Sequence, residues 1–272
     1  PSVPELPEVE TTLRGIEPLI LNKTISSIIV RQASLRWPVP TRLLKDKLIN
    51  KNFSGIRRRG KYLILQSHEG FLIIHLGMSG SLRVVQEEDL KKHDHIDIKF
   101  EDESILRYCD PRRFGCFLWT DTPNSHFLLK NLGPEPLGNS FNGKYLFDLS
   151  RKRKTPIKNF IMNSKIVVGV GNIYASEALF RAKIRPTRQA GKVSLQSYET
   201  LSEEIVSILR KSIDQGGTTL RDFVGSDNKP GYFKQQLEVY GRQGKECKIC
   251  ASTLKNKIIG QRSSVFCPKC QK

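Results

Sequence analysis

Four cysteines near the C-terminal end constrain this chain more than any other feature. Cys247 and Cys250 form one C-x-x-C pair, Cys267 and Cys270 form a second, and sixteen residues separate the pairs. Each pair can turn two thiolates towards one point, and the intervening stretch is long enough for a β-hairpin that returns the second pair to the first. We therefore expect a four-Cys zinc finger with one structural zinc ion. Two redox pairs or two disulfides would fit poorly with an intracellular protein.

The tip of this hairpin would fall near residues 260–264. Arg262 at the tip could reach a phosphate, and a solvated arginine is an equally good interpretation. The remaining cysteines, Cys109 and Cys116, lie in apolar, strand-like contexts. We expect them to be buried small hydrophobic residues rather than metal ligands.

The charge balance points to a polyanionic partner. The 272 residues include 45 Lys and Arg against 27 Asp and Glu, which leaves a formal net charge of +18. A field of that sign attracts polyanions, so nucleic acid is the first interpretation and an anionic membrane surface the second. A basic, solvated surface without a partner is the third. The hydrophobic fraction of 38% is that of an ordinary globular protein with a packed core.

Targeting signals are not evident in the sequence. No stretch approaches the roughly 20 apolar residues of a membrane span. The acidic, proline-rich N-terminal stretch is unlike a signal peptide. We therefore expect a soluble protein of the cytoplasm.

The first half of the chain predicts a β-sandwich or barrel with one leading helix. Residues 5–20 combine early glutamates with apolar residues at helical spacing. Residues 96–100 alternate strictly between apolar and polar side chains, as a half-buried strand does. Further strands are expected where β-branched and aromatic residues gather, at residues 24–30, 62–66, 71–76 and 82–85.

The second half predicts helices, so the fold class is α+β with several domains. Two prolines and two glycines within residues 132–138 mark a linker or hinge. Helices are expected at residues 156–164, 172–183 and 194–214, followed by a loop at 221–235. The expected divisions are an N-terminal β-sandwich domain (1–132), a linker (133–150), a helical domain (151–236) and a zinc finger (237–272).

Seven stretches of the chain and the four-Cys finger together carry a family resemblance. The stretches are residues 4–10, 58–63, 75–80, 92–95, 110–115, 133–136 and 170–177. In this order they resemble the formamidopyrimidine-DNA glycosylases over roughly residues 4–272, and no single motif would suffice. The related endonuclease VIII group, which prefers oxidised pyrimidines, typically begins with a different Pro-Glu-Gly signature, so this N-terminus resembles the purine-directed branch.

The resemblance implies a bifunctional DNA glycosylase and AP lyase. In this family the nucleophile is the amine of the N-terminal proline, which Pro4 matches. An α-amino group has a reference pKa of about 7.7–8.0, so part of it is neutral near pH 7. The resemblance further makes Glu5 the proton shuttle, Lys61 a helper near the base and phosphate, and Arg262 a phosphate-gripping residue of the second elimination.

The chain departs from the family pattern at its start, because Pro1, Ser2 and Val3 precede Pro4. A proline inside a peptide bond has no free amine. We favour the hypothesis that Val3 marks a GUG start codon, so that removal of the initiating Met exposes Pro4. A second hypothesis makes Pro1 the nucleophile, and a third leaves the chain as written without lyase activity. As structure alone, the motif would be an acidic helix cap with prolines at its entry.

An enzyme that acts at C1′ must take the nucleotide out of the base stack, and something must fill the gap. The resemblance assigns this to three gap-filling residues. Met78 and Phe114 would wedge apolar surface into the duplex, and Arg112 would hydrogen-bond the orphaned partner base. Without the resemblance, Met78 and Phe114 would be interpreted as core residues.

Further residues are expected to grip the DNA backbone. Asn172 lies where a helix begins, and backbone N–H groups at such a point form an anion site. His93, Lys158 and Arg153 match or lie near other backbone contacts of the family, although the basic run 151–154 could equally be a solvated linker face. Such contacts set affinity and register rather than base identity. Loop 221–235 resembles the family's lesion-reading loop.

The expected partner is duplex DNA that carries 8-oxoguanine or ring-opened purines opposite cytosine, bound by a monomer in the bacterial nucleoid. Two alternatives remain. One is a non-enzymatic DNA-binding zinc-finger protein, which fits the composition and cysteines equally well. The other is an oxidised-pyrimidine glycosylase of the same fold.

Overall fold

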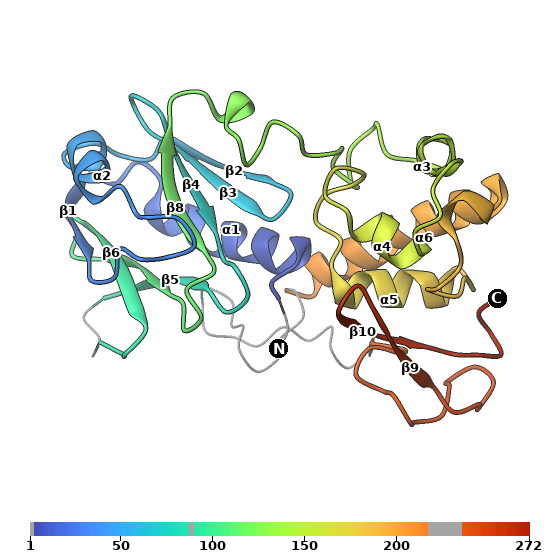
Figure 1. Ribbon diagram of the computed structural model, residues 1–272. Helices are drawn as coiled ribbons and strands as arrows, with labels where there is room; N and C mark the ends of the chain where they lie inside the picture. The colour runs from blue at the N-terminus through green and yellow to red at the C-terminus, as the bar shows by residue number, and fades with distance from the viewer. Residues whose placement is uncertain (1–2, 87–89, 217–235) are drawn as a thin grey trace. The chain divides into compact units, whose positions relative to one another are not determined.

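The structure, a computed structural model, describes residues 3–86, 90–216 and 236–272. It divides into two compact units, each with its own core (Figure 1). We call the described residues up to Lys130 the sandwich unit, and residues 131–214 with 236–272 the helical unit. Pro1 and the expected loop at 221–235 lie outside the described residues.

The leading helix is held at its start by two glutamates. Helix α1 (Leu6–Ile20) begins after Glu5, and a reciprocal capping box joins Glu5 to Glu8. The Glu5 N–H donates to Glu8 Oε2 over 3.0 Å, and the Glu5 carboxylate accepts from the backbone N–H of Glu8. This satisfies two groups that a helix start otherwise leaves without partners. The apolar residues on the buried face of α1 are Leu6, Val9, Leu13, Ile16 and Ile20.

Two antiparallel four-stranded sheets form the sandwich unit, as expected. Their orders are β1-β6-β7-β5 and β2-β3-β4-β8, and a single buried cluster that includes residues of both sheets forms the core. The elements are β1 (Ile25–Val30), α2 (Thr41–Leu48), β2 (Gly55–Arg59), β3 (Tyr62–Gln66), β4 (Phe71–His75), β5 (Ser81–Val85), β6 (Asp94–Phe100), β7 (Ile105–Cys109), β8 (Cys116–Thr120) and the short 3-10 helix η1 (Pro123–Ser125).

Strand β6 differs from the expectation of a half-buried strand, because its polar residue Asp97 is also buried. Arg107 Nε donates to one Asp97 oxygen over 2.9 Å, and Arg107 Nη2 donates to the other over 3.0 Å. Arg31 Nη2 approaches the second oxygen to 2.5 Å. Burial raises the pKa of Asp97, but the two guanidinium groups outweigh it, so the pKa lies below its ordinary value. Paired in this way, a charged residue can occupy a core position.

Replacing Asp97 by Asn should destabilise the sandwich unit. It removes the carboxylate charge that accepts two hydrogen bonds from the buried Arg107 guanidinium, so we expect the free energy of unfolding to fall by about 3 kcal/mol, measured by urea titration. Asp97 has a lowered pKa, so its stabilisation is full above about pH 4 and is lost as the pH falls through the folded-state pKa. The difference between variant and wild type should therefore shrink in acid. Asp102→Asn, which removes an exposed pair with Lys23, is the control, and an equal effect there would contradict the account.

The helical unit corrects the expected linker. Residues 143–150, which we expected to belong to a linker, form helix α3 (Gly143–Ser150), and the side chain of Asn142 caps its start by accepting from the Tyr145 N–H. A Cβ at Gly143 would lie 2.4 Å from Glu199 Cα, so α3 packs closely on α6. The remaining helices are α4 (Ile157–Met162), α5 (Asn172–Arg181), η2 (Ala190–Lys192) and α6 (Leu195–Asp214). Within the described ranges, no helix is both long and apolar enough to cross a membrane.

The expected β-hairpin closes the helical unit. Strands β9 (Lys255–Ile259) and β10 (Arg262–Phe266) are antiparallel, with Ile259 opposite Arg262. The two turn residues, Gly260 and Gln261, both have positive φ angles, of 55° and 64°. Two such residues make the tight turn whose twist suits a two-residue hairpin. The hairpin tip therefore lies where the sequence predicted it.

Candidate nucleic-acid interface and metal centre

The four finger cysteines converge. Their Sγ atoms all lie within 4.8 Å of one another, with 3.9 Å from Cys247 to Cys270 and 3.4 Å from Cys250 to Cys267. A disulfide would need about 2.05 Å, whereas a tetrahedral metal site with metal–sulfur bonds of about 2.3 Å separates its sulfurs by about 3.8 Å. The donor set therefore fits one metal ion and leaves no coordination position for a substrate.

The other two cysteines belong to the sandwich unit. Cys116 is buried and Cys109 half-buried. Burial raises the pKa of Cys109 to about 11 and that of Cys116 to about 12, so both stay protonated thiols at neutral pH. Cys116 is thus buried as expected, whereas Cys109 is only half-buried, and neither belongs to the four-Cys cluster.

Metal content tests this division of the cysteines. We expect purified protein to hold one metal ion per chain, measured by elemental mass spectrometry, and Cys267→Ser to lose most of it because three thiolates hold a metal less tightly than four. Cys109→Ser is the matched control and should retain the metal. Retention in Cys267→Ser, or loss in Cys109→Ser, would contradict the assignment.

On the helical unit, a buried lysine joins helix α5 to the finger. Lys158 has no exposed surface, and its Nζ donates to Asn172 Oδ1, to the Ser263 carbonyl over 3.1 Å and to Ser264 Oγ. Asn172 is the first residue of α5 and is half-buried, and Arg262, beside Ser263, is exposed. Lys158 thus joins Asn172 to the finger strand beside Arg262. It fixes these two expected DNA contacts relative to each other.

A buried glutamate that we assigned no role makes a second connection. Glu177 of α5 accepts the backbone N–H groups of Glu238, Val239 and Tyr240 over 2.5, 2.9 and 2.9 Å. Burial raises the pKa of Glu177 although these N–H groups lower it. The carboxylate fixes the path of the chain into the finger. Its only sequence signal was its place in the motif 170–177.

The basic run 151–154 is exposed but is also used internally. The Arg151 guanidinium lies 3.7 Å from the Phe147 ring centroid, and that of Arg153 lies 5.6 Å from the Phe160 centroid. Arg153 Nε also donates to the Leu149 carbonyl over 3.1 Å. Arg153 remains a predicted DNA contact, and its guanidinium has a packing role as well.

On the sandwich unit, α1 packs against β2 and β3, the strands that flank Lys61. Arg58 Nε lies 3.5 Å from Glu10 Oε1 and connects α1 to β2. Pro4 and Glu5 are buried, Glu5 with 1% of its surface exposed. The carboxylate expected to move protons is therefore the one that caps α1.

His75, which the sequence interpretation left without a role, lies close to Lys61. Its ring stacks on Tyr62 at a centroid distance of 4.7 Å, and its Nδ1 accepts the Gly77 N–H over 2.9 Å. Burial, with the charges of Lys61 and Arg36, lowers its pKa to about 4. The imidazole is therefore neutral near pH 7 and fixes the start of the turn that carries Met78.

The three residues expected to fill the gap in the base stack lie on two turns rather than in the core. Met78 is half-buried, and Arg112 and Phe114 are exposed, Phe114 by 42%. The Arg112 guanidinium lies 5.4 Å from the Phe114 ring centroid. His93, also half-buried, accepts the Asp110 N–H on its carbonyl at the start of the second turn. The exposed Phe114 ring on a tight turn suits contact with a partner better than a core role does.

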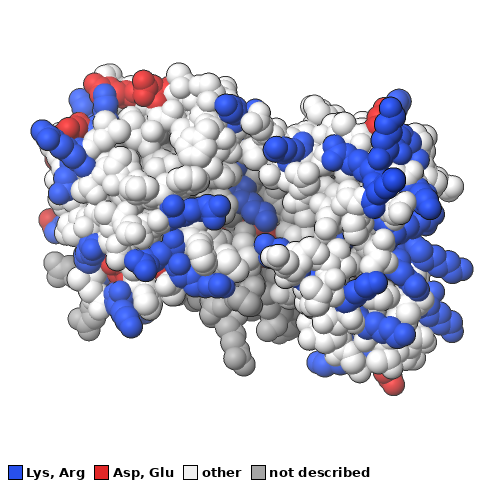
Figure 2. All heavy atoms as spheres, viewed as in Figure 1, with Lys and Arg blue, Asp and Glu red and all other residues white. Residues whose placement is uncertain are grey.

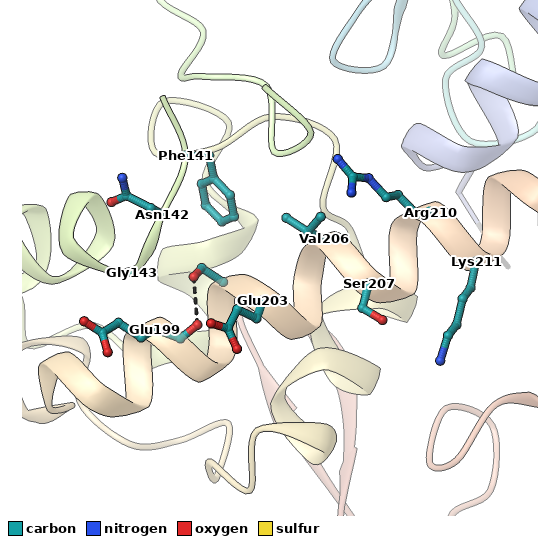
Figure 3. Close-up of a pocket in the computed structure, with 10 residues that line it drawn as sticks. Phe141, Asn142, Gly143, Glu199, Glu203, Val206, Ser207, Arg210 and Lys211 are labelled. Atoms are coloured by element: carbon teal, nitrogen blue, oxygen red, sulfur yellow. Dashed lines mark hydrogen bonds between the residues drawn. The ribbon is translucent and has the colours of Figure 1, made fainter. Parts of the chain in front are cut away.

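Basic side chains are prominent on the viewed face of each unit, where Lys and Arg outnumber Asp and Glu (Figure 2). A separate hollow of about 610 Å³ lies between the start of α3 and one side of α6 (Figure 3). Ser202 Oγ donates to the Glu199 carbonyl at its wall over 2.9 Å. None of the predicted site residues lines this hollow, and we assign it no part in the chemistry.

Comparison with known proteins covers the whole chain. The model of the formamidopyrimidine-DNA glycosylase N-terminal domain matches residues 3–117, and that of the formamidopyrimidine-DNA glycosylase H2TH domain matches residues 132–224. The formamidopyrimidine-DNA glycosylase of Stutzerimonas stutzeri (strain A1501) is 55% identical over 99% of this chain and 100% of that protein. That of Magnetococcus marinus is 53% identical over the same shares.

Solved structures agree. A Lactococcus lactis Fpg variant in complex with Fapy-dG-containing DNA is similar with a TM-score of 0.92 and 35% identity, over 99% of this chain and 100% of that one. A complex of L. lactis Fpg with DNA containing an abasic site is similar with a TM-score of 0.91 and 36% identity, over 98% and 99%. The chain therefore belongs to the formamidopyrimidine-DNA glycosylase family.

Proposed function

We propose that this protein removes oxidised purines, such as 8-oxoguanine and formamidopyrimidines, from duplex DNA and then cleaves the strand at the resulting abasic site. The observation that carries the proposal is the placement of the half-buried Met78 and the exposed Arg112 and Phe114 on adjoining turns of a chain 55% identical to a named formamidopyrimidine-DNA glycosylase. The similar solved structures hold Fapy-dG or abasic-site DNA. The protein acts as a cytoplasmic monomer associated with the nucleoid.

The first step is attack by the Pro4 nitrogen on the sugar C1′. Its lone pair forms the N–C1′ bond while the bond from C1′ to the damaged base breaks, and the base leaves with the electron pair and takes a proton. The proline nitrogen loses its own proton. The sugar ring then opens at its C1′–oxygen bond, that oxygen takes a proton, and an iminium forms. This cation acidifies the adjacent C–H, so loss of that proton expels the 3′ phosphate, and a second elimination expels the 5′ phosphate.

Pro4 can perform this step only as the first residue, because a peptide-bonded proline has no available lone pair. The family model begins to match at residue 3, the residue that the start-codon hypothesis makes the initiating one. Retention of residues 1–3 would favour the second candidate function, a protein that binds damaged DNA without cutting it.

The remaining residues have supporting roles. Glu5 moves protons to and from the sugar, Lys61 assists near the base and its phosphate, and Arg262 holds a phosphate during the second elimination. His93, Arg153, Lys158 and Asn172 complete the grip on the backbone, Lys158 by positioning. The metal of the finger is zinc, which favours four thiolates in a tetrahedron and stabilises the fold rather than the reaction.

Glu5→Gln separates the chemical role of this residue from its capping role. The Gln side-chain oxygen can still accept the Glu8 N–H, so the helix should form, but the side chain can no longer shuttle a proton. For a chain starting at Pro4, we expect single-turnover release of 8-oxoguanine opposite cytosine to fall about a hundredfold or more.

Glu17→Gln, near the other end of α1, is the control and should keep normal activity. Wild type should release 8-oxoguanine faster than an oxidised pyrimidine in the same duplex. The reverse order would support the pyrimidine-directed alternative, and an unchanged rate in Glu5→Gln would contradict the proton-shuttle role.

Salt dependence tests the DNA grip independently of cutting. Each neutralised phosphate releases counterions, so affinity for an 8-oxoguanine duplex should fall steeply, as a power of salt concentration, between about 50 and 200 mM. Arg262→Ala should reduce the slope of log affinity against log salt concentration by the share of about one phosphate contact. Fluorescence anisotropy measures the affinity. A flat dependence for wild type would count against DNA as the partner.

A further inference from the structure

The three gap-filling residues come from two separate stretches of chain, the turn at Gly77–Gly80 and the turn at Asp110–Gly115. The turns pack backbone to backbone. A Cβ on Gly77, which has a φ of +61°, would lie 2.5 Å from the Phe114 carbonyl carbon and from the Gly115 nitrogen. A Cβ on Gly115 would lie 1.8 Å from the Tyr108 hydroxyl. Little room is left for either turn to move independently.

The hydroxyl of Ser79 joins these turns. Ser79 is only 8% exposed. Its Oγ donates to Asp110 Oδ1 over 2.8 Å and accepts the Arg112 backbone N–H over 3.0 Å. Both bonds cross from the turn that carries Met78 to the turn that carries Arg112.

The Asp110 carboxylate extends the connection through the second turn. Oδ1 also accepts the Arg113 N–H over 3.1 Å, while Oδ2 accepts the Gly115 N–H over 2.9 Å and the Tyr108 hydroxyl over 2.6 Å. Asp110 therefore holds its own turn through four donors, and Ser79 is the one of them that comes from the Met78 turn.

We propose that Ser79 is a positioning residue that makes Met78, Arg112 and Phe114 enter the duplex as one rigid unit. This inference rests on the proposed function and adds a residue to it. Ser79 lies next to Met78 in sequence, so its two bonds set the position of Met78 relative to Arg112. Without them, each group can still reach the DNA, but the opened base stack is held less well.

Ser79→Ala is a clean test. It removes the hydroxyl without adding volume, and the Asp110 carboxylate keeps its bonds to Tyr108, Arg113 and Gly115, so the fold should persist. Ser79→Thr restores a hydroxyl at the same position. Ser81→Ala is the matched control, since the Ser81 side chain makes no hydrogen bond in the described part of the chain. Thermal unfolding checks that all variants fold.

The readout is the fluorescence of 2-aminopurine placed beside the lesion, which rises when the stack is opened. We expect Ser79→Ala to lose most of the rise and to slow 8-oxoguanine release about tenfold, the value of one hydrogen bond of about 1.4 kcal/mol. Borohydride trapping on a preformed abasic site, where no base has to be extruded, should change less than about twofold. Ser79→Thr should recover part of the fluorescence rise and part of the rate of 8-oxoguanine release. Ser81→Ala should match wild type in all three measurements.

Equal behaviour of Ser79→Ala and Ser81→Ala would overturn the inference. So would equal losses in base release and abasic-site trapping together with a lower melting temperature, because that pattern means a structural role alone. Base unstacking precedes bond breaking, so the fluorescence reports on Ser79 even if no strand is cut. Absence of release and trapping in wild type would count against the proposed function instead.

Discussion

The buried carboxylate of Asp110 is the interaction on which the proposed DNA-contacting side of the sandwich unit depends. A carboxylate without exposed surface is costly unless hydrogen bonds satisfy it. Asp110 receives donors from its own turn, from Tyr108 and from Ser79. These requirements fix the turn that presents Arg112 and Phe114. The exposed side chains are thereby preorganised, which reduces the entropy lost when they meet a partner.

The helical unit also contains two buried ionisable side chains that several hydrogen bonds satisfy. Lys158 is buried and directs its donors to Asn172 and to the finger strand, and Glu177 is buried and accepts three backbone N–H groups at the entry to the finger. A buried charge with complete partners resists displacement, because moving any partner leaves the charge unsatisfied. The exposed Arg262 and half-buried Asn172 are thus carried on backbone that the buried Lys158 and Glu177 hold. The four-Cys cluster fixes the opposite end of the finger.

The sequence predicted features that depend on local spacing. The cysteine pairs, the hairpin tip at Gly260 and the helix at residues 194–214 follow from turn chemistry and periodicity, and the structure confirms them. Features that depend on distant partners were wrong or missing. Helix α3 was not predicted, because it follows a Pro- and Gly-rich stretch that indicated a linker, although Asn142 is a good helix cap. Asp97 was expected on an exposed face, because only the fold reveals Arg31 and Arg107 beside it.

The central claim is that the Pro4 amine forms a covalent bond to the sugar of a damaged nucleotide. Borohydride trapping on an 8-oxoguanine duplex, followed by peptide mass mapping, measures this directly. The account predicts a cross-link at Pro4 of a chain that lacks residues 1–3, and none when these residues are retained. A cross-link at Pro1 would keep the enzyme but contradict the assigned nucleophile. Tight lesion binding without any trapping in the chain that starts at Pro4 would contradict the claim itself.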